Sequence, residues 1–241
     1  DKSHELSGYE TMQYINNSPD ELDIIYIHLW PNAYKNDESA MAKQLYENGE
    51  LDFYYSEDKD RGFIDSLNFE IDGKTAKWKI DSTHVDIAKL YLNSPLKSGE
   101  KISITTPFHV KIPLGIYSRL GHMGESYQIT QWYPKPAVYD KNGWNQMPYL
   151  TQGEFYSEFG SFDVSITLPE NYVLGATGDM VDGEEELAWL NEKVLLTEAK
   201  TSYDENMDFP ESSAKLKTLR FKQNNVHDFA WFADKRYHVL K

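Results

Sequence analysis

Apolar residues recur at every second position in many short segments of this chain, and turn residues separate those segments. Alternation runs over residues 67–71 up to Asp72-Gly73 and resumes over 76–80. A period of two is typical of strands with one buried face. An Asp-Gly pair between two such segments favours a hairpin, because both central residues of a type I′ turn need a positive φ. The pattern therefore predicts antiparallel β-structure.

The same reasoning predicts further strands. Residues 23–30 form a nearly unbroken apolar run that Pro31 ends, which is typical of a central strand covered on both faces. The other expected strands lie at 9–14, 85–92, 102–106, 108–112, 162–168, 216–221 and 229–232.

One short helix is expected. Asn36 or Asp37 is a suitable N-cap, Met41 and Leu45 fall on one face, and Gly49 stands where a helix ends in the left-handed conformation. Residues 184–194 fit either a short helix or an edge strand, and the sequence leaves both open.

Periodicity is lost between residues 115 and 160, where Tyr, Trp and Phe accumulate together with Gly and Pro. Disordered segments are poor in aromatic residues, so we expect an ordered loop over Tyr127–Phe159. The predicted fold is all-β, an antiparallel saddle or sandwich of sheets with one short helix and a long aromatic-rich loop. No repeat or linker divides the chain, so residues 1–241 are expected to form a single domain.

Composition excludes several classes of function. The 241 residues carry 24 Lys and Arg against 39 Asp and Glu, a formal net charge of −15. This charge argues against nucleic acid as a partner, since phosphate binding depends on dense positive charge. No apolar run reaches the roughly 20 residues of a membrane span. Cysteine is absent from the sequence, which excludes disulfides and cysteine nucleophiles.

Catalytic and metal-binding motifs are not found either. No His is followed by another at the i+4 spacing of a helical zinc site, and no Gly-x-Ser-x-Gly motif occurs. His28 is expected to be a core histidine, and His227-Asp228 a polar pair at a strand end. Glu154 and Glu158 lie in the aromatic loop, where a glycosidase pair stays open, although a solvated face is the preferred interpretation. We expect no catalytic residue and no metal ligand in this chain.

Side chains suited to binding are concentrated in the aromatic loop. Gln131 offers both hydrogen-bond donors and acceptors, which suits the amino end or the backbone of a peptide. Tyr and Trp provide large contact areas with a polar tip. A carbohydrate-binding β-sandwich that stacks sugars on Trp132, Tyr133 and Trp144 is an alternative from another class.

Several segments resemble the N-terminal domain of M1-family zinc metallopeptidases, the relatives of aminopeptidase N and leukotriene A4 hydrolase. They are Tyr14-Ile-Asn-Asn-Ser-Pro-Asp-Glu-Leu22, Ile25-Tyr-Ile-His-Leu-Trp-Pro-Asn-Ala-Tyr34, Tyr127-Gln-Ile-Thr-Gln-Trp-Tyr-Pro-Lys135, Gly153-Glu-Phe-Tyr-Ser-Glu-Phe-Gly-Ser-Phe-Asp-Val-Ser-Ile-Thr-Leu-Pro169, Gly175-Ala-Thr-Gly178 and Val226-His-Asp-Phe-Ala-Trp231. The residues after Thr130-Gln131 differ from the sequence that is usual in the family at this point. In this respect the chain resembles a divergent bacterial branch of the family.

The resemblance implies a β-domain that covers one side of a zinc aminopeptidase active site. Gln131 would line the substrate cleft, and Trp132, Tyr133 and Glu154 of the same loop would border the peptide. The zinc and its His-Glu-x-x-His motif would belong to a C-terminal catalytic domain that this chain lacks, as would the Gly-x-Met-Glu-Asn motif that binds a peptide's amino end. The chain begins with Asp1 rather than Met, so we expect either a processed protein or a sequence whose upstream part is missing. The expected location is the periplasm, the cell surface or the medium. A scaffold domain in a catalytically dead homologue is a third possibility.

Overall fold

The structure is a computed structural model, and it describes residues 2–153, 155–202 and 208–241. Its residues gather into two compact units. The larger unit comprises residues 3–121 and 131–158, and the smaller comprises residues 122–130 and 159–241 with the N-terminal end. Strands make up 42% of the described residues and helices 12%, and the sheets are antiparallel, which confirms the predicted all-β class. A single domain over 1–241 stays a prediction.

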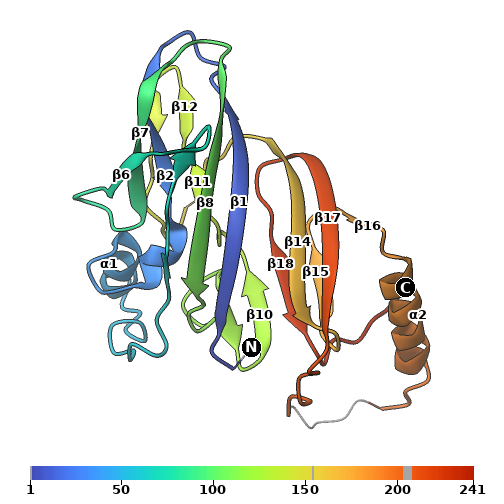
Figure 1. The fold of residues 1–241 in the computed structure, drawn as a ribbon. Coiled ribbons are helices and arrows are strands. Elements are labelled where there is room, and N and C mark those ends of the chain that lie inside the picture. The colour runs from blue at the N-terminus through green and yellow to red at the C-terminus, as the bar shows by residue number, and fades with distance from the viewer. Residues whose placement is uncertain (1, 154, 203–207) are drawn as a thin grey trace. The chain divides into compact units, whose positions relative to one another are not determined.

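The first sheet of the larger unit is built on one long ladder (Figure 1). Strands β1 (Glu5–Ile15) and β8 (Lys101–Lys111) pair over their whole length. The expected strands 102–106 and 108–112 are therefore one strand that continues through Pro107. Proline lacks the N–H that a ladder needs. On the side of β8 away from β1, Pro107 has no partner in either short strand, because β3 (Phe63–Asp65) pairs with residues 109–111 and β4 (Glu70–Ile71) pairs with residues 104–105.

The Asp-Gly hairpin is confirmed. Asp72 and Gly73 have φ values of 49° and 75°, and they join β4 to β5 (Lys74–Thr75). The chain then leaves this sheet, because β6 (Lys77–Ile80) pairs with a strand of the second sheet.

The second sheet has the strand order β11-β2-β7-β6. Strand β2 (Leu22–His28) lies between β11 (Lys135–Pro136) and β7 (Ile87–Leu96), which confirms the predicted central strand. It ends two residues earlier than expected, because the 3-10 helix η1 (Trp30–Tyr34) follows. The Phe69 ring, just before β4, packs edge to face on Trp78 of β6, with the ring centres 5.5 Å apart.

Helix α1 (Ala40–Glu47) follows η1 and buries Met41, Ala42 and Leu45. Its N-cap is Ser39, whose Oγ accepts from the Ala42 N–H over 3.0 Å, so the expected caps Asn36 and Asp37 were wrong. Gly49 has a φ of 79°, as a left-handed helix end requires.

The smaller unit holds two sheets and a second helix. One sheet has the order β15 (Val173–Ala176), β18 (Trp231–Asp234), β10 (Ser126–Ile129) and β9 (Gly121–Met123). The other places β17 (Leu216–Val226) between β14 (Gly160–Pro169) and β16 (Asp179–Val181). Helix α2 (Glu184–Glu198) resolves the ambiguous segment, so the prediction of one helix was too low. Its three glutamates in the first turn complement the positive end of the helix dipole.

The aromatic segment differs from the long loop that we expected. It contains β10, β11 and the hairpin of β12 (Val138–Asp140) and β13 (Gly143–Asn145), all of four residues or fewer. Strands this short leave little alternation to detect in a sequence. Of the helices that the structure describes, none is both long and apolar enough for a membrane span.

Candidate functional site

Gln131 lies between β10 and β11 in an unusual backbone conformation. Its φ is 48°, in the left-handed region that few residues other than glycine adopt, and its side chain is half-buried. A non-glycine residue held in this region costs on the order of 1 kcal/mol or more and persists where the surrounding structure fixes it. The residue singled out from the sequence is therefore also a backbone outlier, which is a frequent property of ligand-contacting residues.

Trp132 and Tyr133 follow Gln131 and contact each other edge to face, with their ring centres 5.4 Å apart and a 75° angle between planes. Trp132 also packs on Phe108 of β8 at 5.8 Å. The Phe108 ring covers Gly8 of β1 so closely that a Cβ there would overlap it. The rings thus form a wall anchored on the first sheet.

Trp144 belongs to another aromatic group. It packs on Tyr26 at 5.6 Å and on Tyr139 at 5.2 Å. Sugar stacking needs exposed and roughly coplanar rings, whereas Trp132 and Tyr133 are close to perpendicular. The arrangement of these rings does not favour the carbohydrate-binding alternative.

Glu154, the fourth expected binding residue, lies outside the described residues. The next residue, Phe155, packs between Trp30 at 4.7 Å and Tyr149 at 5.1 Å, and the Arg119 guanidinium lies over its ring. Glu158 lies close enough to Tyr14 to act on it electrostatically. Burial first, and then the negative charge of Glu158, raise the pKa of the Tyr14 hydroxyl to about 12.

A buried hydrogen-bond network holds the aromatic segment in the larger unit. The Tyr149 hydroxyl accepts from the Tyr34 hydroxyl and contacts the Ser118 hydroxyl, each over 2.9 Å. The Asp86 carboxylate accepts the Tyr149 main-chain N–H over 2.6 Å. Burial raises the pKa of Asp86 to about 6. Nothing in the sequence around Asp86 distinguishes it from a surface aspartate, so its role could not be predicted.

His28 is a core histidine, as expected. Its side chain is buried, stacks on Trp30 at 4.6 Å, and accepts the Met147 N–H at Nε2. Burial, and then the nearby positive charge of Lys135, lower the pKa of His28 to about 3. A neutral imidazole held in this way supports structure rather than proton transfer.

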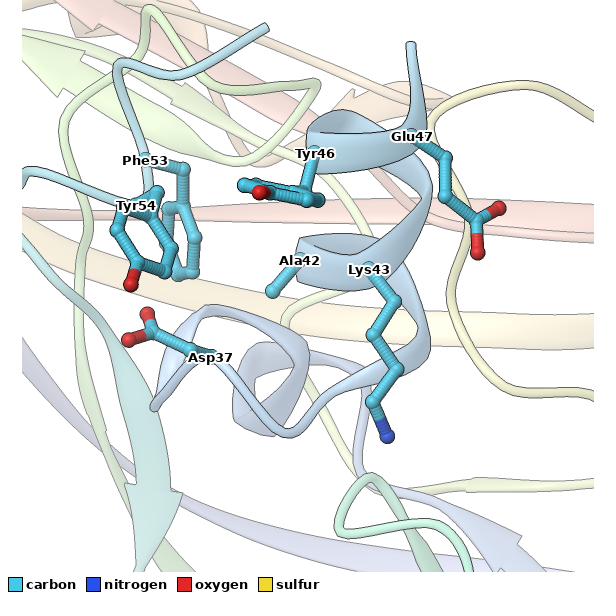
Figure 2. A pocket seen from close by; sticks show the side chains of 7 residues that line it. All are labelled: Asp37, Ala42, Lys43, Tyr46, Glu47, Phe53 and Tyr54. Carbon is cyan, nitrogen blue, oxygen red and sulfur yellow. The ribbon is translucent and has the colours of Figure 1, made fainter. Parts of the chain in front are cut away.

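A pocket of about 210 Å³ opens between α1 and the segment that follows it (Figure 2). Ala42 and Phe53 line its inner part, with Tyr46 and Tyr54 beside them. Asp37, Lys43 and Glu47 are the charged residues around it. The sequence signal for this site is the Tyr54-Tyr55 pair within an acidic stretch.

Metal ligands do not assemble in the described part of the chain: no group of three or more His, Asp or Glu side chains there could hold an ion. In the smaller unit, His227 packs on Phe159 with ring centres 6.0 Å apart, and Asp228 accepts the Phe229 N–H.

Comparison with models of protein families finds no match, and neither does comparison with curated proteins. Among solved structures, the chain is similar to an M1 zinc metallopeptidase from Deinococcus radiodurans, with 14% identity and a TM-score of 0.49 over 95% of this chain. It is also similar to a two-domain M1 zinc metallopeptidase mutant bound to L-tryptophan, with 14% identity and a TM-score of 0.48 over 96% of this chain. The chain spans 38% of the length of each of these proteins. They carry the family name that the sequence segments suggested.

Proposed function

We propose that this chain is the non-catalytic N-terminal β-domain of an M1-type zinc metallopeptidase. Gln131 carries the proposal: the sequence resemblance assigns it to the substrate cleft, and its left-handed backbone conformation, which is frequent at functional positions, supports that assignment. Its partners would be a C-terminal catalytic domain and a peptide substrate at the edge of the cleft.

The chemistry of this chain would be binding and orientation. The Gln131 amide can donate to a peptide carbonyl and accept from a peptide amine. The Trp132 and Tyr133 rings would form an apolar wall beside it, with Phe108 as its support. By the family resemblance, zinc would be held by the catalytic domain, where it would supply a Lewis acid for a bound water and the peptide carbonyl.

The test uses the chain joined to the residues that its gene encodes after Lys241. If that continuation carries His-Glu-x-x-His, Gln131→Ala is expected to lower kcat/KM for an aminoacyl p-nitroanilide by about tenfold or more, since a hydrogen bond to a charged group is worth about 1.5–3 kcal/mol. Gln13→Ala, at an exposed position of β1, is the matched control. An unchanged kcat/KM for Gln131→Ala would remove Gln131 from the cleft.

A scaffold role in an inactive homologue gives a different result. In that case the continuation lacks the zinc motif, and the joined protein neither binds zinc nor hydrolyses the substrate. We also propose a location in the periplasm, at the cell surface or outside the cell. Fractionation of the source cells with an antibody against the chain tests that proposal separately.

A further inference from the structure

The residues that line the pocket beside α1 are held in place by contacts with neighbouring side chains. Phe53 is buried and meets Tyr117 edge to face at 5.0 Å. The Arg61 guanidinium lies over Phe53 at 5.1 Å and donates to Ser56 Oγ and Asp37 Oδ1 over 2.9 and 2.7 Å. These contacts tie the segment after α1 to the residues before it, so the pocket is preformed.

Three tyrosines beside the pocket are exposed without an evident structural reason. Tyr46, Tyr54 and Tyr55 are 58%, 50% and 75% exposed. They nonetheless contact one another, with ring centres 5.5 Å apart for Tyr46 and Tyr54 and 5.2 Å for Tyr54 and Tyr55. An exposed aromatic cluster next to a cavity is typical of a binding surface rather than of a scattered surface residue.

The charge around this cluster is negative. Residues 35–61 contain eight Asp and Glu side chains against three Lys and Arg61. Arg61 is already engaged by Asp37, and the Lys43 side chain extends away from Tyr46 and Tyr54 (Figure 2). Asp37 Oδ2, the oxygen that Arg61 does not use, makes no hydrogen bond to any residue that the structure describes. The surface that a ligand meets therefore combines aromatic faces with carboxylates.

We propose that this pocket binds the arginine side chain of a peptide. A guanidinium can stack on the Tyr46 and Tyr54 rings and donate to the Asp37 carboxylate at the same time. The protein already makes this combination with its own Arg61, which lies over Phe53 and donates to Asp37. The volume of about 210 Å³ suits one side chain rather than a larger ligand.

Charge complementarity selects this occupant over others. A neutral saccharide would use the rings and could donate hydroxyl groups to a carboxylate, but it would gain no charge attraction, and an acidic peptide would be repelled. A lysine side chain supplies the charge, yet its compact ammonium has no flat face to stack on a ring and no planar fork to donate two parallel hydrogen bonds, as a guanidinium does. The site is independent of the proposed function, since it needs neither zinc nor a second domain.

The test follows the amide NMR signals of Ala42, Tyr46, Phe53 and Tyr54 in the full 241-residue chain. The probe is the capped peptide acetyl-Gly-Gly-Arg-Gly-Gly-amide, titrated at low salt. We expect shifts confined to these residues, weaker binding of the Lys peptide, and no saturable shift with the uncharged citrulline peptide. Tyr46→Ala and Tyr54→Ala should each weaken binding about two- to fivefold, since an exposed cation–π contact is worth ~0.5–1 kcal/mol.

Tyr9→Ala is the matched control, because Tyr9 is exposed on β1 and does not line the pocket. Equal binding of the citrulline and Arg peptides would overturn the proposal. So would a larger response to a neutral oligosaccharide, or an Arg titration that Tyr54→Ala leaves unchanged. Since all three tyrosines are exposed, loss of folding is not expected to obscure the result.

Discussion

The main-chain N–H of Tyr149 donates to Oδ2 of Asp86 over 2.6 Å, although the two residues are 63 positions apart. Asp86 directly precedes β7, and its own carbonyl accepts the Leu29 N–H over 2.8 Å. One aspartate thus connects the residues before β7 with the end of β2 and with the aromatic segment. Because Asp86 is only 1% exposed, its ionised form is costly.

Asp86→Asn tests this cost. Folding raises the pKa of Asp86 from 3.8 to about 6, so its contribution to stability is greatest below pH 3.8 and is lost as the pH rises through 6. The shift corresponds to on the order of 2 to 3 kcal/mol. Asparagine keeps a carbonyl oxygen for the Tyr149 N–H. We expect the variant to gain stability relative to wild type between pH 4 and 7, measured by urea unfolding.

Asp81→Asn is the control, five residues away with the opposite pKa shift. The hydrogen bond from Lys89, over 2.6 Å, lowers the pKa of Asp81. Its contribution is present above pH 3.8 and is lost as the pH falls through the lowered folded value. The two variants should therefore change the pH dependence in opposite directions. If Asp86→Asn and wild type have parallel profiles, the carboxylate is not buried as described.

The strand pattern could be predicted where local chemistry decides it. The Asp72-Gly73 turn needs two positive φ angles, and β2 needs apolar residues on both faces, so both features were visible in the sequence. The cap of α1 was not, because three good capping residues occur close together there. Ser39 caps the helix, whereas Asn36 accepts the Glu38 N–H in a local turn.

The candidate site was only partly predictable for a similar reason. Gln131 could be chosen by residue type and resemblance, but its left-handed backbone depends on how β10 and β11 are joined. Asp86 and Tyr149 pair across 63 positions, and no local pattern records such a partner. The exposed Tyr46 and Tyr54 meet because the turn that follows α1 folds back onto the helix, which the spacing of the two residues in the sequence does not reveal.

His28→Gln tests how a buried histidine, like the buried Asp86, makes stability depend on pH. Folding lowers the pKa of His28 from 6.5 to about 3. The contribution of neutral His28 to the free energy of unfolding is therefore fully present above pH 6.5 and is lost as the pH falls toward 3. Glutamine keeps an acceptor for the Met147 N–H but loses the stacking on Trp30, which costs about 1 kcal/mol at pH 7. The variant should lose less stability than wild type between pH 7 and 4.5.

Urea midpoints at the two pH values measure the difference. Since the slopes of His28 and Asp86 have opposite signs between pH 4 and 6, they partly cancel in the wild type. Each single variant should therefore have a steeper profile than wild type, in opposite directions, and the double variant should run close to wild type between pH 4 and 6. An acid loss in His28→Gln as large as that of wild type would show that another group causes it.

Gly8→Ala tests the support beneath Trp132. A Cβ at this position would overlap the Phe108 ring, so the ring must move and the contact with Trp132 must change. Overpacking of this kind costs about 1–3 kcal/mol, which lowers Tm by several degrees in a chain of this size. Gly175→Ala is the control, because a Cβ there meets nothing within 4 Å. Equal Tm values for the two variants would contradict the close packing.

Helix α2 exposes two of its leucines to solvent, and substitutions at neighbouring positions can test this arrangement. Val194 is 8% exposed, whereas Leu195 is 67% exposed and Leu196 is equally open. The buried side of the helix instead includes Glu186, paired with Lys217 over 2.6 Å, and Thr197. The helix is therefore held by few apolar contacts.

Val194→Ala removes one of those contacts and should cost about 1–2 kcal/mol in urea unfolding, from which the better helix propensity of alanine subtracts a few tenths. Leu195→Ala removes the larger side chain, yet it should change stability by less than about 0.5 kcal/mol, because that side chain already contacts water. Hydrophobicity alone ranks the two substitutions the other way. A larger loss for Leu195→Ala than for Val194→Ala would therefore mean that the leucine side of α2 is covered in solution.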